Sequence, residues 1–198
     1  MDVESVKSMI RRDVLRRRST ISSVEIEDCS ENAGEAVKSF IEEVTGRSLD
    51  ELTVMSYMSY KTEFPTKSVN QMLLDSGARL AVPYTGPDFS ITACLVDSLE
   101  DLAPSSMGIP EPDPEKTDHI TPEDADIILM PGVAFDKSGS RVGYGKGCYD
   151  RFLGMCEGKL PILAALAWAI QIVEDIPQDE NDIKCDYIFT ENGVIRCH

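Results

Sequence analysis

The 198-residue sequence lacks the patterns that mark several classes of protein. It has only two histidines, and its six cysteines contain no C-x-x-C pair. A zinc site of the usual cysteine and histidine type is therefore not expected. The longest apolar stretch, residues 160–173, is shorter than the roughly 20 residues that a membrane-spanning helix needs. We therefore predict a chain without a membrane span.

Basic residues are also scarce, because 19 Lys and Arg stand against 35 Asp and Glu, for a formal net charge of -16. This charge disfavours nonspecific binding to nucleic acid or to an anionic membrane. An anionic small ligand would need a local basic site. The first eighteen residues are charged and amphipathic, without the apolar core of a signal peptide. We expect a cytoplasmic protein with reduced thiols, acting on small molecules as a monomer or weak dimer.

The apolar and charged fractions, 42% and 27%, are ordinary for a globular protein. We expect helices at 2–18, at 22–44, at 65–75, from 149 onward and at 170–176. We expect strands at 52–58, 78–84, 89–96, 125–130, 161–167 and 185–190. In the second helix, the residues predicted to face inward are Ala36, Val37, Phe40, Ile41 and Val44. Alternating strands and helices predict one α/β domain over 1–198 with a mostly parallel sheet.

Residues 104–124 interrupt this alternation with five prolines and no periodicity. Neither side of the segment forms a self-sufficient half of the chain. We therefore predict a long loop that acts as a lid or a wrap, rather than a linker between domains.

A glycine-rich stretch, "RVGYGKGCYDRF" at 141–152, follows the predicted strand 125–130. Ligands in open parallel sheets bind beyond the carboxyl ends of strands, and closely spaced glycines let backbone N–H groups approach phosphate. The spacing matches neither the Walker pattern nor the dinucleotide-binding pattern. A phosphate loop and a turn-rich strand connection both remain open. Asp150 suits magnesium on a nucleotide, or it is simply an aspartate favoured at a helix start.

The first predicted helix carries six of the nineteen basic residues, with Lys7 and Arg11 one turn apart. They form either part of an anion site or a solvated basic face.

These segments together resemble the 5-formyltetrahydrofolate cyclo-ligase family, also called 5,10-methenyltetrahydrofolate synthetase. Residues 130–153, "MPGVAFDKSGSRVGYGKGCYDRFL", resemble the family's long signature. Further matches follow in the family's order: "KSMIRRDVLRRRSTIS" at 7–22, "YMSYKTEFPT" at 57–66, "GIPEP" at 108–112 and "DENDIKCDYIFTE" at 179–191.

The resemblance implies a three-layer α/β/α fold similar to ribose-5-phosphate isomerase and CoA transferases. It also implies ATP-dependent cyclisation of 5-formyltetrahydrofolate to 5,10-methenyltetrahydrofolate, with release of ADP and phosphate. The formyl oxygen is phosphorylated and N10 then attacks. The ATP-binding residues it implies are Lys7, Arg11, Arg141, Val142, Gly143, Tyr144, Gly145, Lys146, Gly147, Cys148 and Tyr149. The folate-binding residues are Met58, Glu63, Tyr144, Gly145, Lys146, Gly147 and Cys148. Lys146 and Arg141 are the predicted catalytic residues, and Asp150 and Asp182 the predicted Mg²⁺ ligands.

The sequence departs from the family at a few positions. Cys148 stands where the family usually has tyrosine, and we interpret it as tolerated variation rather than as a nucleophile, because no histidine lies nearby in sequence. Pro65 replaces a residue that is often acidic, and we expect it at the first position of a helix. Two alternatives stay open: a noncatalytic paralogue that binds folate or nucleotide, and a sugar-phosphate enzyme of the same fold.

Overall fold

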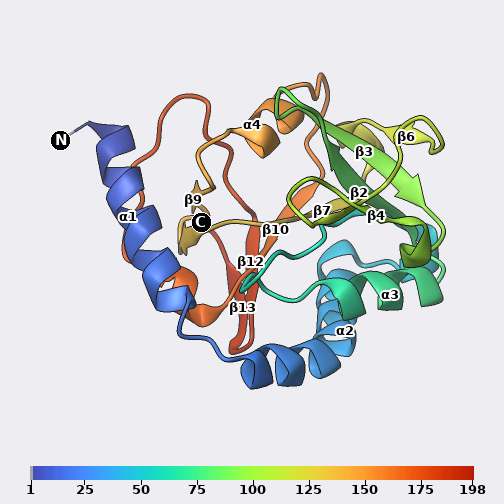
Figure 1. Ribbon diagram of the computed structural model, residues 1–198, viewed down its shortest axis with the longest axis horizontal. Helices are drawn as coiled ribbons and strands as arrows, with labels where there is room; N and C mark the ends of the chain where they lie inside the picture. Colours follow the sequence, from blue (N-terminus) through green and yellow to red (C-terminus); the bar gives the residue numbers. More distant parts are fainter. Residues whose placement is uncertain (1) are drawn as a thin grey trace.

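The computed structural model describes residues 2–198, and its centre is an eight-stranded sheet (Figure 1). The strand order is β13-β12-β10-β7-β1-β2-β3-β6. The strands are β1 (Thr53–Met55), β2 (Arg79–Thr85), β3 (Ile91–Val96), β6 (His119–Ile120), β7 (Ile127–Met130), β10 (Ile162–Leu166), β12 (Tyr187–Thr190) and β13 (Gly193–Arg196). The five central strands from β12 to β2 run parallel, whereas β13 and β3 are antiparallel to their neighbours. The predicted α/β class with a mostly parallel sheet is confirmed.

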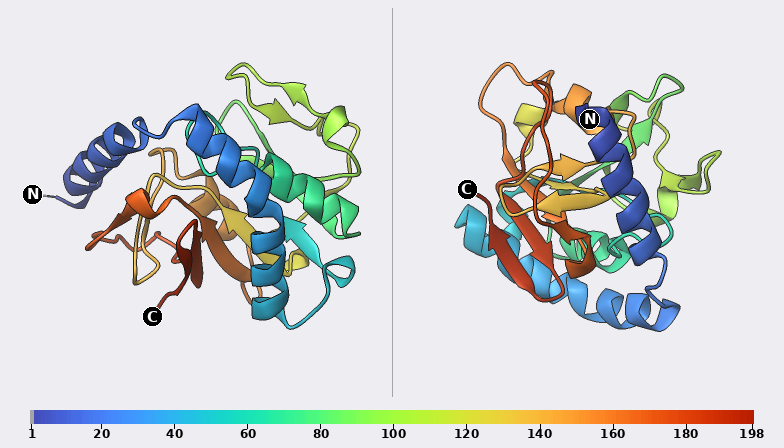
Figure 2. Two further views of the ribbon diagram at one scale, coloured as in Figure 1. Left: turned by 90° about the horizontal axis from the view of Figure 1, so that it is seen from below. Right: turned by 90° about the vertical axis from the view of Figure 1, so that its left-hand side faces the viewer.

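One face of the sheet is covered by α2 (Ser23–Thr45) and α3 (Lys67–Asp75), which lie side by side in Figure 2. A capping box between Ser22 and Glu25 starts α2, because each residue satisfies a free N–H of the other. The α2 side chains Val37, Phe40 and Ile41 pack into the core of this face. The prediction was wrong at Ala36, which is exposed, and Ala33 takes its place in the core.

The opposite face is covered by α4 (Cys148–Leu153) and by a small sheet in the order β11-β8-β9. Its strands are β8 (Ala134–Asp136), β9 (Arg141–Val142) and β11 (Ile172–Val173). Phe135 of β8 and Phe152 of α4 pack with Met130 of the central sheet. Helix α1 (Val3–Arg18) lies outside this layer, where Val14 packs against the small sheet (Figure 2).

The structure corrects the expected helix at 170–176, which is a short 3₁₀ turn, η4 (Ala169–Gln171), followed by β11. The β-branched Ile172 and Val173 pair with β8, as their restricted χ1 favours. The Asp136 carboxylate accepts a hydrogen bond from Ile176 N at 2.9 Å, so this amide is not available to a helix. Strand β13 and the β8–β9 pair were not predicted at all.

The proline-rich segment 104–124 is more ordered than a loop. It contributes to β4 (Ala103–Pro104), contains β5 (Pro110–Glu111) and η3 (Pro122–Asp124), and adds β6 to the edge of the central sheet. The β4–β5 pair stands out from the body in the left view of Figure 2. The segment therefore wraps the sheet edge, whereas its movement as a lid stays a prediction.

Two further 3₁₀ turns, η1 (Leu49–Glu51) and η2 (Leu99–Asp101), complete the elements. Pro65 precedes Thr66, the N-cap of α3, so it lies just outside the helix and not at its first position as expected. Among residues 2–198, no helix combines the length and apolar character needed to cross a bilayer.

Candidate active site

A cleft of about 1460 Å³ opens where α1, the segment 141–151 and the loops after β1 and β2 meet. Every residue predicted for the site lines it. These residues are Lys7, Arg11, Met58, Glu63, Arg141, Val142, Gly143, Tyr144, Gly145, Lys146, Gly147, Cys148, Tyr149, Asp150 and Asp182. The fold therefore brings together residues from distant parts of the sequence, although their roles toward ligands stay predictions.

The glycine segment, residues 143–147, forms one wall of the cleft. Gly145 and Gly147 have φ values of +90° and +61°, which L side chains rarely adopt. Gly147 is also the N-cap of α4. Arg11 Nε of α1 donates to Gly143 O at 2.8 Å, so the basic helix is fastened directly to this wall. The basic face of α1 is thus turned to the cleft at Lys7 and Arg11 rather than to open solvent.

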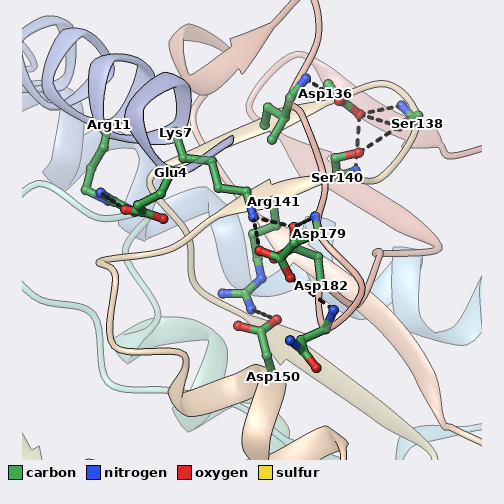
Figure 3. Close-up of polar contacts among 12 residues, drawn as sticks. Glu4, Lys7, Arg11, Asp136, Ser138, Ser140, Arg141, Asp150, Asp179 and Asp182 are labelled. Atoms are coloured by element: carbon green, nitrogen blue, oxygen red, sulfur yellow. Dashed lines mark hydrogen bonds and ion pairs between the residues drawn. The ribbon is translucent and has the colours of Figure 1, made fainter. Parts of the chain in front are cut away.

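At one end of the cleft, which we call the charge-paired end, the predicted phosphate-binding residues form ion pairs with the predicted Mg²⁺ ligands (Figure 3). Lys7 pairs with Asp182, and Arg141 pairs with Asp150. Lys7 Nζ bonds Asp182, and it lies 3.0 Å from Asp179 Oδ2. Arg141 Nη2 lies 2.8 Å from Asp150 Oδ1. Burial opposes the charge of Lys7, but its hydrogen bonds to the two aspartates raise its pKa overall. The bond from Lys7 in turn lowers the pKa of Asp179.

Residues 2–198 contain no group of three or more histidine, cysteine, aspartate or glutamate side chains that could hold a metal ion. Magnesium on a nucleotide usually needs only one or two carboxylates, because phosphates and water complete its shell. The hydrogen bonds described here use one oxygen of each carboxylate, Asp150 Oδ1 and Asp182 Oδ2. The donor set at this end therefore fits a nucleotide-bound Mg²⁺, and does not fit a resident metal held by protein alone.

The other end of the cleft, which we call the tyrosine end, is built around Glu63 with Tyr57, Tyr144 and Tyr149. The Tyr144 hydroxyl donates to Glu63 Oε1 at 2.6 Å, and Tyr60 N donates to Glu63 Oε2 at 2.8 Å. Glu63 is only 7% exposed, and burial raises its pKa. The Tyr149 hydroxyl is buried without a hydrogen-bond partner among the described residues. Burial also raises the pKa of Tyr149, so its hydroxyl keeps its proton.

Lys146 lies at the mouth of the cleft with its Nζ 4.6 Å from the centre of the Phe89 ring. Arg151 fastens this region, because it donates to Lys146 O at 2.6 Å and to Phe89 O at 2.9 Å. Neither Phe89 nor Arg151 was predicted. Phe89 has φ +62°, which is uncommon for a bulky residue. A phenylalanine after Gly-Pro-Asp in a turn was the available signal.

Sequence reasoning also missed Arg18, the last residue of α1. It is 3% exposed, and its Nη2 donates to the Tyr144 hydroxyl at 2.6 Å. The sequence shows Arg18 only as one of several arginines in a row, so no periodicity distinguishes it from Arg16 or Arg17.

Comparison with known proteins gives one consistent result. A profile of the 5-formyltetrahydrofolate cyclo-ligase family matches residues 3–191. The chain is 30% identical to the probable 5-formyltetrahydrofolate cyclo-ligase of Caenorhabditis elegans, over 98% of this chain and 96% of that protein. It is also 30% identical to the mitochondrial 5-formyltetrahydrofolate cyclo-ligase of Arabidopsis thaliana, over 77% of this chain and 58% of that protein. Among solved structures, the 5,10-methenyltetrahydrofolate synthetase of Aquifex aeolicus superposes with a TM-score of 0.80 at 32% identity, covering 96% of this chain and 92% of that one.

Proposed function

The chain belongs to the 5-formyltetrahydrofolate cyclo-ligase family and is an enzyme of that kind; from this premise we propose that it closes 5-formyltetrahydrofolate to 5,10-methenyltetrahydrofolate with conversion of ATP to ADP and phosphate. One observation carries the proposal. A single cleft contains both the charge-paired end and the tyrosine end with its buried Glu63 carboxylate, and the glycine segment forms one of its walls. Such a cleft can hold a polyanion and a folate side by side.

The proposed reaction has two steps. The terminal phosphoryl group of ATP passes to the formyl oxygen, which leaves ADP. The N10 lone pair then attacks the formyl carbon, the N10 proton is lost, and the C–O bond breaks to release phosphate. Phosphoryl transfer depends on positioning and charge neutralisation rather than on a protein nucleophile. The cleft supplies these through cations and backbone amides, without a role for the Cys148 thiol.

The charge-paired end supports nucleotide binding. Lys7 and Arg141 would exchange their aspartate partners for phosphate oxygens, and Arg11 is fixed beside them by Gly143. Asp150 and Asp182 would hold Mg²⁺, which neutralises phosphate charge when bound. Lys146 has no carboxylate within 4.0 Å in the described part of the chain, so it is free to meet the transferred group.

The tyrosine end supports folate binding. A pterin ring presents N–H donors, and the buried Glu63 carboxylate is an acceptor held by Tyr144 and Tyr60. Tyr149 offers a donor without a partner among the described residues. Met58 lines the same part of the cleft. All six cysteines are free, which agrees with a reducing compartment such as the cytoplasm as part of the proposal.

Purified protein mixed with 5-formyltetrahydrofolate and Mg-ATP tests the proposal through the absorbance of the methenyl product. We expect product only when both substrates are present. Binding of folate and nucleotide without turnover would instead support a noncatalytic paralogue. Product formation that survives the loss of both Lys7 and Arg11 would contradict their proposed role in binding the nucleotide.

A further inference from the structure

Arg18 is a buried cation that does not line the cleft, although it contacts segments that do. It is 3% exposed. Its Nη2 donates to the Tyr144 hydroxyl at 2.6 Å, Nε to Thr62 Oγ1 at 3.2 Å and Nη1 to Gly132 O at 3.4 Å. One guanidinium therefore joins the end of α1, the turn before Glu63 and the glycine segment.

A buried charge requires compensation. Within residues 2–198, no carboxylate lies within 4.0 Å of Arg18. Its counter-charge is reached through Tyr144, whose hydroxyl accepts from Arg18 and donates to Glu63 Oε1, each at 2.6 Å. Hydrogen bonds that involve an ionised group are shorter and stronger than neutral ones. The three side chains thus form one continuous bridge, Arg18–Tyr144–Glu63.

The bridge also fixes the position of the Tyr144 hydroxyl. Tyr144 lies between Gly143 and Gly145, and its side chain is 48% exposed. Glu63 has a second anchor at Tyr60 N, within a turn in which Lys61 adopts φ +54°. Trp168 also stabilises this turn, because its Nε1 donates to Thr62 O at 3.0 Å.

We propose that Arg18 is a positioning residue for folate, which acts through Tyr144 to aim the Glu63 carboxylate into the cleft and to hold the glycine segment against the turn at 60–63. This inference rests on the proposed function for its substrate, but the bridge itself does not. Arg18 is not a catalytic residue, because it does not line the cleft.

The bridge also has an electrostatic consequence. The titratable and charged groups that face Glu63 are Tyr57 after β1, Tyr144 of the glycine segment, Tyr149 of α4 and Arg18 of α1. Burial raises the pKa of Glu63, whereas the hydrogen bond from Tyr144 and the charge of Arg18 oppose this rise. Without Arg18, the pKa of Glu63 rises further. On acidification, a protein without Arg18 therefore loses the ionised Glu63 carboxylate at a higher pH than the wild type does.

The test compares Arg18→Met, Arg18→Lys, Tyr144→Phe and the double variant Arg18→Met/Tyr144→Phe by steady-state kinetics. We expect Arg18→Met to raise KM for 5-formyltetrahydrofolate about tenfold, the size of a lost hydrogen bond to a charged group, while kcat and KM for ATP change by less than about twofold. The acid limb of kcat/KM for folate should move to higher pH. Arg18→Lys should restore part of the affinity, since it keeps the charge. The double variant should behave as Tyr144→Phe alone, because two residues in one bridge are not additive.

Arg16→Met is the matched control, since Arg16 lies on the same helix with an 80% exposed side chain and pairs only with Asp13. It should leave all constants unchanged. An Arg18→Met variant that raises both KM values equally, or a double variant whose effects add, would overturn the inference. If Arg18→Met does not fold, Tyr144→Phe alone carries the test, because it removes only the bridging hydroxyl. An unchanged KM for folate in that variant also overturns it.

Hydrogen exchange in the ligand-free protein separates this inference from the proposed function. The amide of Glu63, which donates to Tyr60 O at 3.1 Å, should exchange faster in Arg18→Met than in wild type or Arg16→Met. Unchanged exchange contradicts the bridge. A wild type without turnover would instead refute the proposed function, and leave the exchange result to decide the bridge.

Discussion

At the charge-paired end of the cleft, Lys7 and Arg141 each already hold an aspartate, whereas at the tyrosine end Glu63 has no cation in direct contact among residues 2–198 and is bonded by neutral donors. The aspartate side chains are partly exposed, at 48% for Asp179, 25% for Asp150 and 18% for Asp182, whereas their cations Lys7 and Arg141 are only 6% and 7% exposed. Glu63 is 7% exposed. The two ends thus differ in charge compensation and in the burial of their carboxylates.

This difference indicates two ways of preparing a binding site. Each ion pair joins a buried cation to a more exposed aspartate. A buried cation needs a partner, so a phosphate chain can take the place of the aspartates without leaving Lys7 or Arg141 uncompensated. A buried carboxylate is costly to desolvate, so the protein meets that cost at Glu63 when it folds. We therefore expect changes at the charge-paired end to act on the nucleotide, and changes at the tyrosine end to act on the folate.

Lys146→Ala should produce the largest effect, because Lys146 lines the cleft within the glycine segment and has no carboxylate partner in the described residues. We expect kcat to fall by about 100-fold to 1000-fold, as when one group that stabilises transition-state charge is lost. The free energy of unfolding should change by no more than about 0.5 kcal/mol, since the side chain is exposed. Steady-state kinetics measures the change in kcat, and thermal melting measures the change in stability. Lys159→Ala, at an exposed lysine outside the cleft, is the control, and near-normal kcat in Lys146→Ala would contradict the phosphate role.

Lys7→Met should come next and should separate the two ends. The variant leaves Asp179 and Asp182 without their cation, and removes one phosphate partner. We expect KM for ATP to rise about tenfold or more, with KM for 5-formyltetrahydrofolate nearly unchanged. Arg12→Met, on the exposed face of the same helix, should alter neither constant. Equal changes in both KM values would show that the two ends are not independent.

Glu63→Gln should have the reverse selectivity, raising KM for folate about tenfold with little change for ATP. It also has a stability signature. Because burial raises the pKa of Glu63 above its usual 4.5, the folded state binds the proton more readily than the unfolded state. Wild-type stability from this group is therefore lost as pH rises through the window between 4.5 and the folded pKa. Denaturant unfolding at several pH values should show the variant gaining stability relative to wild type across that window. A constant difference would mean that Glu63 titrates normally.

Cys148→Ser should have the smallest effect. Cys148 lines the cleft, but the proposed chemistry uses no thiol and the side chain forms none of the bonds that join the two ends. We expect kcat and both KM values to stay within about threefold of wild type, as for a substitution outside a hydrogen-bond network. A loss of kcat comparable to that of Lys146→Ala would give the thiol a role that the proposal lacks.

Several features were predictable from local sequence. The period of Val37, Phe40 and Ile41 predicts the buried face of α2, and a short apolar run predicts β7 as a strand covered on both faces. The segment 170–176 was not predictable in this way. Its helical pattern is overridden because Ile172 and Val173 find a partner strand in β8 and because Asp136 captures the amide of Ile176. Local propensity is a weak prior where tertiary partners compete.

The candidate site likewise has features that the sequence indicated and others that only tertiary contacts decided. Glycine spacing and the basic first helix indicated an anion site, and the resemblance of segments from 7 to 191 implied a set of site residues that all line the cleft. Tyr57, Phe89, Arg151 and Asp179 line it as well and were not predicted. Only the tertiary structure decided that Lys7 pairs with Asp182, that Arg18 reaches Glu63 through Tyr144, and that Arg151 fastens Phe89. These contacts join residues remote in sequence, and the first two depend on how α1 is docked against the small sheet. Arg16 and Arg18 belong to one run of arginines in the sequence, and only packing gives them different roles, because it buries Arg18 and leaves Arg16 in water.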